Sequence, residues 1–283
     1  MIKPEGRLLS QQVPSASFSM RFVVEKNATR KIGLARALSK LGYCSRSRAA
    51  ELIHAGRVCL NGKVRRDPEA PVSGKCDQIA VDGRVVETRN KIYLMLNKPR
   101  GIVTTASDEK GRDTVYTMMN ACSAGRTNLP DGSLPWVAPV GRLDKASEGL
   151  LLLTDNSEWA ARITAPETHL EKTYHVQVRA VVDEEFIQTL VRGVQAKDGE
   201  VLRAKQARRL RAGQKSCWLE IILDEGKNRQ IRRMIEAMGV AVLRLIRVAI
   251  GPLRLGDLAK SEHRALSLEE KRTLDRAMRK QIL

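Results

Sequence analysis

The sequence predicts an α+β protein in which a small unit of helices and hairpins precedes a larger domain built on strands. Two observations predict the small unit. Apolar residues recur at helical spacing after Ile32, and Asn-Gly and Asp-Gly dipeptides, which favour two-residue hairpins, follow short apolar runs. Farther along, alternating and apolar runs typical of strands are separated by amphipathic segments, which predicts the larger domain. The length of 283 residues suffices for two domains.

Two short helices are expected at the start of the small unit. Ser45 is expected to cap the second helix, and a glycine ends each of them. Strands are expected at Val58–Leu60 and Ile79–Val81, each followed by a hairpin dipeptide. The expected buried residues of the two helices are Leu34, Leu38, Leu41, Ala49, Leu52 and Ile53.

The larger domain is expected to contain several strands and two amphipathic helices. The strands are expected at residues 92–96, 172–178, 217–223 and 242–248, and the helices at 184–191 and 228–239. Asn228 is expected to cap the second of these helices. Arg229, Arg232 and Arg233 lie off its apolar stripe and Lys227 precedes it, so a basic groove wall is favoured over a solvated face.

The charge of the chain predicts a polyanionic partner. Lysine and arginine number 50 against 32 acidic residues, giving a net charge of +18. Ten basic residues and a single acid, Glu51, lie between Arg30 and Arg66. Nucleic acid is the favoured partner, and a membrane is disfavoured because no apolar run approaches the ~18 residues of a spanning helix. Residues 203–215 contain six basic residues and no acids, which is equally typical of an RNA-contacting loop and of a solvated hairpin.

The sequence gives no sign of a metal or a cofactor. The five cysteines are far apart, with no Cys-x-x-Cys pair, the four histidines are scattered, and no Gly-rich nucleotide loop is present. We therefore expect a cytoplasmic protein without cofactor or metal. The five cysteines are Cys44, Cys59, Cys76, Cys122 and Cys217.

The two ends of the chain are expected to lie outside the domains. Residues 1–31 are typical of a flexible basic extension, although a transit peptide or a misassigned start at Met20 are open alternatives. Residues 263–283 are expected to form a helical tail.

Asp144 is the candidate for the chemistry. It lies in the polar segment Gly141–Gly149, directly before the apolar run Leu150–Leu153, which is typical of a buried strand. A rigid strand can hold a catalytic group accurately. Taken alone, an aspartate in such a segment is more often a turn residue that bonds its own backbone, so its function has to be inferred from the rest of the chain.

Two sets of motifs resemble known families. The segments 41–49 and 53–58 with Asn61-Gly62 resemble the S4 RNA-binding domain, except that Gly33 stands where that family usually has a basic residue. The remaining motifs closely resemble, in order, those of the RsuA-type pseudouridine synthases of ribosomal RNA. They are residues 97–101, 141–155, 171–174, 225–234 and 243–247.

The resemblance implies a fold and a set of catalytic residues. It implies an S4 domain at 32–89 and a catalytic domain at 90–262, built on a mixed, mainly antiparallel β-sheet flanked by helices. It also implies site-specific isomerisation of uridine to pseudouridine with base flipping. The matching positions are Asp144 as the essential aspartate, Arg142 as the base-displacing arginine, Tyr174 as the uracil-stacking ring, Arg232 as the aspartate-pairing arginine and Leu245 as an apolar packing residue.

The same resemblance implies a monomer that binds ribosomal RNA. The side chains expected to contact that RNA are Arg46, Arg48, Arg57, Lys98, Lys172, Lys227, Arg229 and Arg233. The sequence leaves open whether the target lies in small- or large-subunit RNA, and whether Asp144 attacks the base or the sugar. The alternative function is a noncatalytic S4-domain RNA-binding or ribosome-assembly factor.

Overall fold

The computed structural model describes residues 31–279 except 74–76, 88, 106–107, 109–110 and 124–135. All but the last residue of the expected N-terminal extension therefore lie outside the described residues, as does Cys76. Within the described part, Cys44, Cys59 and Cys217 are free thiols, and no group of histidine, cysteine and acidic side chains is arranged to hold a metal ion. None of the described helices has both the length and the apolar character needed to cross a membrane.

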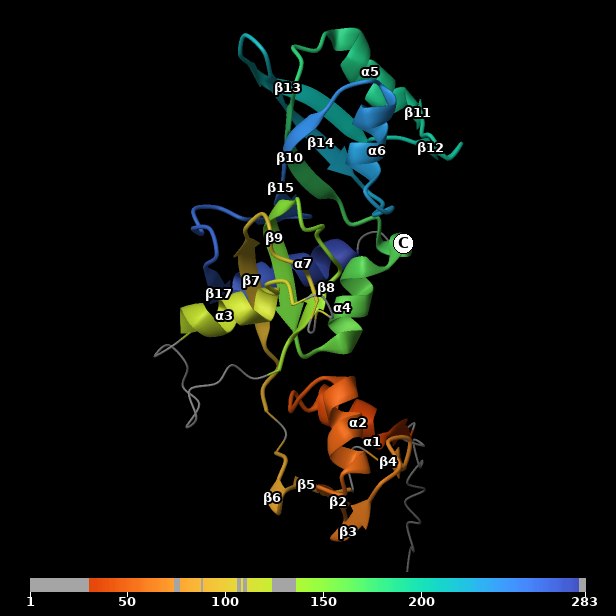
Figure 1. The fold of residues 1–283 in the computed structure, drawn as a ribbon, viewed down its shortest axis with the longest axis vertical. Coiled ribbons are helices and arrows are strands. Elements are labelled where there is room, and N and C mark those ends of the chain that lie inside the picture. The colour runs from red at the N-terminus through yellow and green to blue at the C-terminus, as the bar shows by residue number, and fades with distance from the viewer. Residues whose placement is uncertain are drawn as a thin grey trace, which may run out of the picture. The chain divides into compact units, whose positions relative to one another are not determined.

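The N-terminal unit contains two helices and two small sheets (Figure 1). Four of its strands pair in the order β3-β2-β5-β6, and β1 pairs with β4. The elements are β1 (Ile32–Gly33), α1 (Leu34–Lys40), α2 (Arg46–His54), β2 (Val58–Leu60), β3 (Lys63–Arg65), β4 (Pro71–Val72), β5 (Ile79–Val81) and β6 (Arg84–Val85).

Local sequence signals account for this unit. Asn61 and Asp82 have φ of 52° and 50°, and each is followed by a glycine with positive φ, as the expected two-residue hairpins require. The side chain of Ser45 caps α2 by accepting a hydrogen bond from the Arg48 amide at 3.2 Å. All six residues expected in the core join one apolar cluster, in which Leu41 is only partly buried.

The larger domain is built on a nine-stranded sheet. Seven strands follow the order β13-β14-β10-β15-β9-β7-β17, while β8 pairs with β9 and β16 with β15. Only the pairing of β15 with β9 is parallel, so the sheet is mixed and mainly antiparallel, as expected. Its strands are β7 (Tyr93–Lys98), β8 (Ala138–Val140), β9 (Glu148–Thr154), β10 (Lys172–Val178), β13 (Gln206–Ala212), β14 (Cys217–Leu223), β15 (Val242–Ile250), β16 (Leu253–Arg254) and β17 (His263–Ala265).

Helices and a small hairpin accompany this sheet. The hairpin consists of β11 (Val194–Gln195) and β12 (Val201–Leu202). The helices are α3 (Val115–Ser123), α4 (Ser157–Thr164), the 3₁₀ turn η1 (Pro166–Thr168), α5 (Glu184–Arg192), α6 (Gln230–Ala237) and α7 (Leu268–Arg279).

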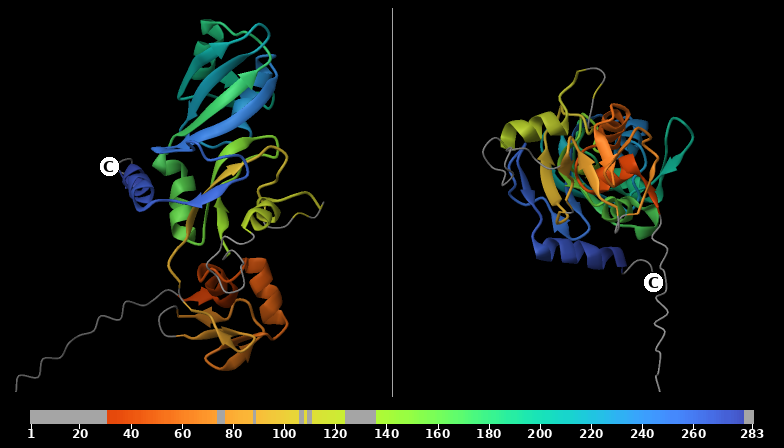
Figure 2. Two further views of the ribbon diagram at one scale, coloured as in Figure 1. Left: turned by 90° about the vertical axis from the view of Figure 1, so that its left-hand side faces the viewer. Right: turned by 90° about the horizontal axis from the view of Figure 1, so that it is seen from below.

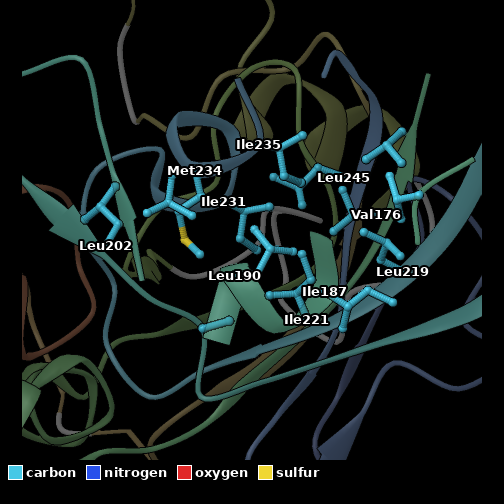
Figure 3. Close-up of a cluster of buried hydrophobic side chains, with 14 of the residues drawn as sticks. Val176, Ile187, Leu190, Leu202, Leu219, Ile221, Ile231, Met234, Ile235 and Leu245 are labelled. Carbon is cyan, nitrogen blue, oxygen red and sulfur yellow. The ribbon is translucent and has the colours of Figure 1, made fainter. Parts of the chain in front are cut away.

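Alternation along the strands distributes the core between the two faces of the sheet. Val176, Leu219 and Leu245 point to the face where α5 and α6 pack, and Figure 3 shows this cluster with Leu190 of α5 and Ile235 of α6. The strand β9 is buried on both faces, as its unbroken leucine run predicts. Leu150 and Leu152 join the cluster that includes α4 and α7, whereas Leu151 and Leu153 join that of α3.

The C-terminal segment belongs to this sheet, which differs from the expected separate tail. β17 pairs with β7 in antiparallel register, so residues 263–265 form an edge of the sheet. The helix is present as α7, but Leu274 and Met278 are fully buried against the core of the domain. Leu274 and Met278 lie four residues apart, so both fall on the face of the helix that packs inward.

Candidate active site

Asp144 lies on the short loop that joins β8 to β9, and its side chain is about one-third exposed, at 35%. The amide of Ser147 closes a turn on the Asp144 carbonyl at 3.0 Å. Two bonds from the preceding loop fix the segment further. The Gly101 amide donates to the Lys145 carbonyl at 2.8 Å, and the Thr104 hydroxyl donates to the Leu143 carbonyl at 2.8 Å. The backbone of the Asp144 loop is therefore held from several sides.

Gly149 is required where this loop enters β9. Its φ is +102°, and a Cβ there would lie 2.3 Å from the carbonyl oxygen of Arg247 on β15. Only glycine tolerates both the backbone conformation and this approach. The glycine thus permits the parallel pairing of β9 with β15, which brings the Asp144 loop beside the strand that carries Leu245.

Lys98 supports the Asp144 loop from inside the protein. Its side chain is fully buried at the end of β7, and Nζ donates to the carbonyls of Pro99 at 3.0 Å, Asp144 at 3.3 Å and Ser147 at 2.9 Å. Burial lowers the pKa of Lys98 to about 8, against the opposing effect of the carboxylates of Asp144 and Glu148. Lys98 was expected to contact RNA, and in the structure its ammonium group is instead enclosed by backbone oxygens.

Two arginines of the α6 region approach the Asp144 loop, in roles that differ from those expected. Arg229 Nη1 lies 3.7 Å from Asp144 Oδ2 and is the ion-pair partner of this carboxylate among the described residues. Arg232, the expected partner, is 6% exposed and donates from Nη2 to the Ala146 carbonyl at 3.0 Å. Burial, then the nearby Arg229, lower the pKa of Arg232, while Asp144 opposes this effect. Its Nε has no hydrogen-bond partner within the described structure.

The start of α6 also differs from expectation. The N-cap is Arg229 rather than Asn228, and it has the left-handed conformation with φ of 48° and ψ of 29°. The helix therefore begins one residue later than the capping preference of asparagine suggests. Gln230 at its first turn is buried and donates from Nε2 to the Arg203 carbonyl at 3.0 Å and to Glu225 at 2.6 Å. These bonds fix the helix end that carries Arg229.

Tyr174 and Leu245 lie on adjacent strands of the same face. In the β10–β15 register, Tyr174 is opposite Arg247, and Val176 is opposite Leu245. Leu245 is buried in the cluster with α5 and α6, and the half-buried Tyr174 packs against that cluster. Arg142 is exposed, two residues before Asp144. An exposed guanidinium and a partly exposed ring are accessible to a ligand, whereas Leu245 can act only through packing.

Arg247 is a second buried arginine of the catalytic domain, on β15. It is 6% exposed, donates from Nε to the Leu150 carbonyl at 2.8 Å, and leaves Nη2 without a partner among the described residues. The nearby Lys172 is half-buried, and burial, followed by the charge of Arg247, lowers its pKa. In the sequence, Arg247 is a basic residue within a largely apolar strand, and this pattern could have indicated a buried cation.

Several of the expected RNA contacts are engaged within the protein. Arg233 of α6 pairs with Asp198 and with Glu200 at 2.8 Å, and Lys227 pairs with Glu200 at 3.2 Å and Glu225 at 3.3 Å. Asp198 and Glu200 lie in the connection of the β11–β12 hairpin. Lys227 and Arg233 were expected to form a basic groove wall, and in the structure both pair with carboxylates, of which Asp198 and Glu200 come from a separate hairpin.

The arginines expected to bind RNA in the N-terminal unit differ in their surroundings. Arg57 makes two bonds to the Asp82 carboxylate, at 2.8 and 2.6 Å, and Arg48 pairs with Glu51 at 2.7 Å. Both arginines remain exposed, so either can exchange its carboxylate for a phosphate. Arg46 is exposed and has no ion-pair partner among the described residues.

Comparisons with known proteins define the class to which this fold and site belong. The family model described as RNA pseudouridylate synthase matches residues 92–237, and the model of the S4 domain matches residues 32–79. The chain belongs to the RNA pseudouridylate synthase family and carries an S4 domain. It is thus a pseudouridine synthase, and the alternative of a noncatalytic RNA-binding factor is not favoured.

Named relatives and a solved structure agree with this class. The ribosomal large subunit pseudouridine synthase B of Bacillus subtilis is 35% identical over 85% of this chain and 94% of its own length. The protein of the same name from Shigella flexneri is 34% identical over 78% of this chain and 74% of its own length. A crystal structure of a pseudouridylate synthase matches with a TM-score of 0.57 and 28% identity, over 86% of this chain and 99% of that one.

Proposed function

We propose that this protein isomerises uridine to pseudouridine at a specific site in ribosomal RNA, with Asp144 as the essential carboxylate. The observation that carries this assignment is the fixed loop around Asp144, which the buried Lys98 holds through backbone carbonyls. The carboxylate on this loop has its Oδ2 3.7 Å from Nη1 of Arg229. The two relatives named above are synthases of the large ribosomal subunit, which favours large-subunit RNA as the substrate.

The reaction requires what this loop offers. The N1–C1′ glycosidic bond breaks, the uracil turns, and a C5–C1′ bond forms, while C5 loses its hydrogen and N1 gains one. Nothing is oxidised or reduced overall. A partly exposed carboxylate on a rigid loop can act as a nucleophile toward the sugar or the base, or as the group that removes the proton. Arg232 and Lys98 then act as positioning residues, because both bind backbone carbonyls of the Asp144 loop.

Three further side chains serve base flipping. The exposed Arg142 enters the stack that the target uridine leaves and binds the backbone phosphate, offsetting an unstacking cost of a few kcal/mol. Tyr174 stacks on the extruded uracil, which is worth about 1–3 kcal/mol per base. Leu245, buried below Tyr174 in the same cluster, keeps the ring in place.

The remaining RNA contacts come from both domains. The S4 domain, residues 32–89, contributes Arg46, Arg48 and Arg57, and the catalytic domain contributes Arg229 and the half-buried Lys172. The catalytic domain runs from residue 90 through α7, since β17 is part of its sheet. The enzyme acts as a cytoplasmic monomer on ribosomal RNA.

Release of the C5 hydrogen gives a direct test. Unmodified large-subunit and small-subunit ribosomal RNA, each transcribed with uridine tritiated at C5, are incubated separately with the protein, and tritium in solvent is counted. Stoichiometric release from large-subunit RNA, with one new pseudouridine located by mapping, is the expected result. Release from neither RNA, with tight binding to both, would instead favour the RNA-binding factor. Release from the small-subunit RNA alone would overturn the choice of subunit.

A further inference from the structure

The basic segment 203–215 is largely an edge strand of the catalytic sheet. β13 pairs with β14, and the bulge between Arg209 and Arg211 sets Arg211 opposite Trp218. Trp218 is opposite Gln177 of β10, and Gln177 is opposite Arg244 of β15. Four side chains from four neighbouring strands therefore form one row across the sheet, in the order Arg211, Trp218, Gln177, Arg244.

This row lies on the face of the sheet opposite α5 and α6. Side chains alternate along β10, so Tyr174 and Val176 point toward the helices while His175 and Gln177 point away. In the left view of Figure 2 the strands β13, β14, β10 and β15, in the upper part, turn this face toward the viewer, with no helix in front of them. Trp218, Gln177 and Arg244 are partly exposed, and Arg211 is exposed. The row is thus open to a partner.

Positive charge and an aromatic ring coincide in this row. The guanidinium carbons of Arg211 and Arg244 lie 5.4 and 5.7 Å from the centre of the Trp218 ring. Arg211 has no carboxylate within ion-pair distance among the described residues, so its charge is uncompensated.

The neighbouring carboxylates do not neutralise the face. Glu148 pairs with both Arg244, at 2.8 Å, and Lys260, at 3.2 Å. Glu220 likewise pairs with Arg208, at 2.7 Å, and with His175, at 3.3 Å. With Arg211, the face carries four permanent cations against these two carboxylates, so the excess is positive. They are Arg208, Arg211, Arg244 and Lys260.

We infer that this face binds an unpaired segment of RNA outside the target nucleotide. The chemistry matches the needs of single-stranded RNA. When a guanidinium turns from the Trp218 ring to a phosphate, a base can stack on the ring in its place, and the amide of Gln177 can bond a base edge. A paired base offers no free face to Trp218, so the segment must be unpaired. Charge complementarity favours RNA over a protein partner.

The surface extends the proposed function without depending on the catalytic residues. Because Gln177 and Tyr174 point to opposite faces of β10, the RNA segment on this row is distinct from the flipped uridine. It provides a second contact on a large folded substrate. Only the identity of the RNA, ribosomal RNA, rests on the proposed function.

Salt-dependent binding tests the surface. The wild type and the variants Arg211→Gln, Trp218→Leu and Trp218→Phe are titrated with a single-stranded oligouridylate of about twelve nucleotides and with unmodified ribosomal RNA at several KCl concentrations. Losing one phosphate contact in single-stranded RNA lowers the slope of log K against log[KCl] by about 0.7, which we expect for Arg211→Gln. Trp218→Leu is expected to weaken binding by about fivefold to a hundredfold, and Trp218→Phe much less.

Arg192→Gln is the matched control, since it removes the same charge from α5 on the opposite face, where Arg192 is exposed. If Arg211→Gln shows the slope of the wild type and of Arg192→Gln, while its melting temperature is unchanged, the surface does not bind RNA. Should Trp218→Leu fail to fold, Arg211→Gln and Trp218→Phe decide alone. Tritium release at saturating RNA is measured in parallel. Its absence in the wild type would overturn the proposed function, whereas a retained slope in Arg211→Gln would overturn only the surface.

Discussion

Arg229 and Asp144 form an ion pair, with Nη1 of the arginine 3.7 Å from Oδ2 of the aspartate. The arginine is 44% exposed and lies in a left-handed conformation at the start of α6. The neighbouring Arg232 faces inward and bonds the backbone of the same loop at Ala146. The two arginines therefore divide the task, since one meets the carboxylate at the surface and the other holds the loop from below.

Arg229→Gln is expected to weaken RNA binding. Its exposed guanidinium makes only loose ion pairs, at 3.7 Å to Asp144 and 4.0 Å to Glu236, and can therefore turn to the phosphates that approach Asp144. Its loss should make the slope of log K against log[salt] shallower by about 0.7–0.9. Arg233→Gln is the matched control, because it removes the same charge one turn along α6, where Asp198 and Glu200 already neutralise it. Titration of ribosomal RNA at several salt concentrations compares them. Equal slopes of log K against log[salt] in the two variants would contradict the claim that Arg229, but not Arg233, is free to bind phosphate.

Arg232→Met is expected to reduce the rate of catalysis more than the affinity for RNA. The substitution removes a charged hydrogen bond to the Ala146 carbonyl, worth about 1.5–3 kcal/mol, and releases the Asp144 loop. The single-turnover rate at saturating RNA should fall about tenfold or more, while the dissociation constant changes little. A variant with the wild-type rate and weakened binding would show that Arg232 contacts RNA instead.

Lys98→Met is expected to destabilise the protein and slow the reaction. Methionine fills a similar volume but leaves the carbonyls of Pro99, Asp144 and Ser147 without their donor. An unpaired buried acceptor costs about 1–3 kcal/mol, which urea unfolding at pH 7 would measure. Unchanged stability together with an unchanged rate would exclude the supporting role. If RNA affinity alone fell, Lys98 would be an RNA contact after all.

The buried Lys98 also predicts a pH dependence of stability. Its pKa is about 8 in the folded protein, below its ordinary value of 10.5, so the unfolded state binds more protons between these values. The free energy of unfolding of the wild type, relative to Lys98→Met, should therefore rise as the pH increases from about 8 toward 10.5. Urea unfolding of both proteins at pH 7 and pH 9.5 measures this difference. If the difference in unfolding free energy between the two proteins stays constant or shrinks at pH 9.5, the lowered pKa of Lys98 is contradicted.

Gly149→Ala is expected to disrupt the junction between β9 and β15. The new Cβ would lie 2.3 Å from the Arg247 carbonyl oxygen, in addition to the strain of a φ of +102°. Gly62→Ala isolates the conformational cost, because Gly62 also has positive φ but has no atom near its Cβ position. The control should lose about 1 kcal/mol and Gly149→Ala several times more. Similar melting temperatures for the two variants would contradict the close approach.

The parts of the fold that depend on neighbouring residues could be predicted from the sequence. The two hairpins, the cap at Ser45 and the buried strand β9 follow from local patterns, and the mixed sheet follows from the family resemblance. Contacts between distant residues could not be predicted. Lys98 looks like a surface lysine until Ser147, nearly fifty residues later, encloses it, and Arg233 looks unpaired until Asp198 reaches it. Charge in the sequence indicates RNA binding, but only tertiary contacts show which cations are available.

The measurement that tests the central claim most directly is tritium release by Asp144→Asn under single-turnover conditions, beside a titration of the same RNA. Asparagine keeps the size of the side chain and the backbone carbonyl that Ser147 and Lys98 bond, but it cannot act as a carboxylate. We expect RNA affinity within a few fold of the wild type and no release of tritium from C5. Release at a rate near that of the wild type would show that Asp144 is not the essential group.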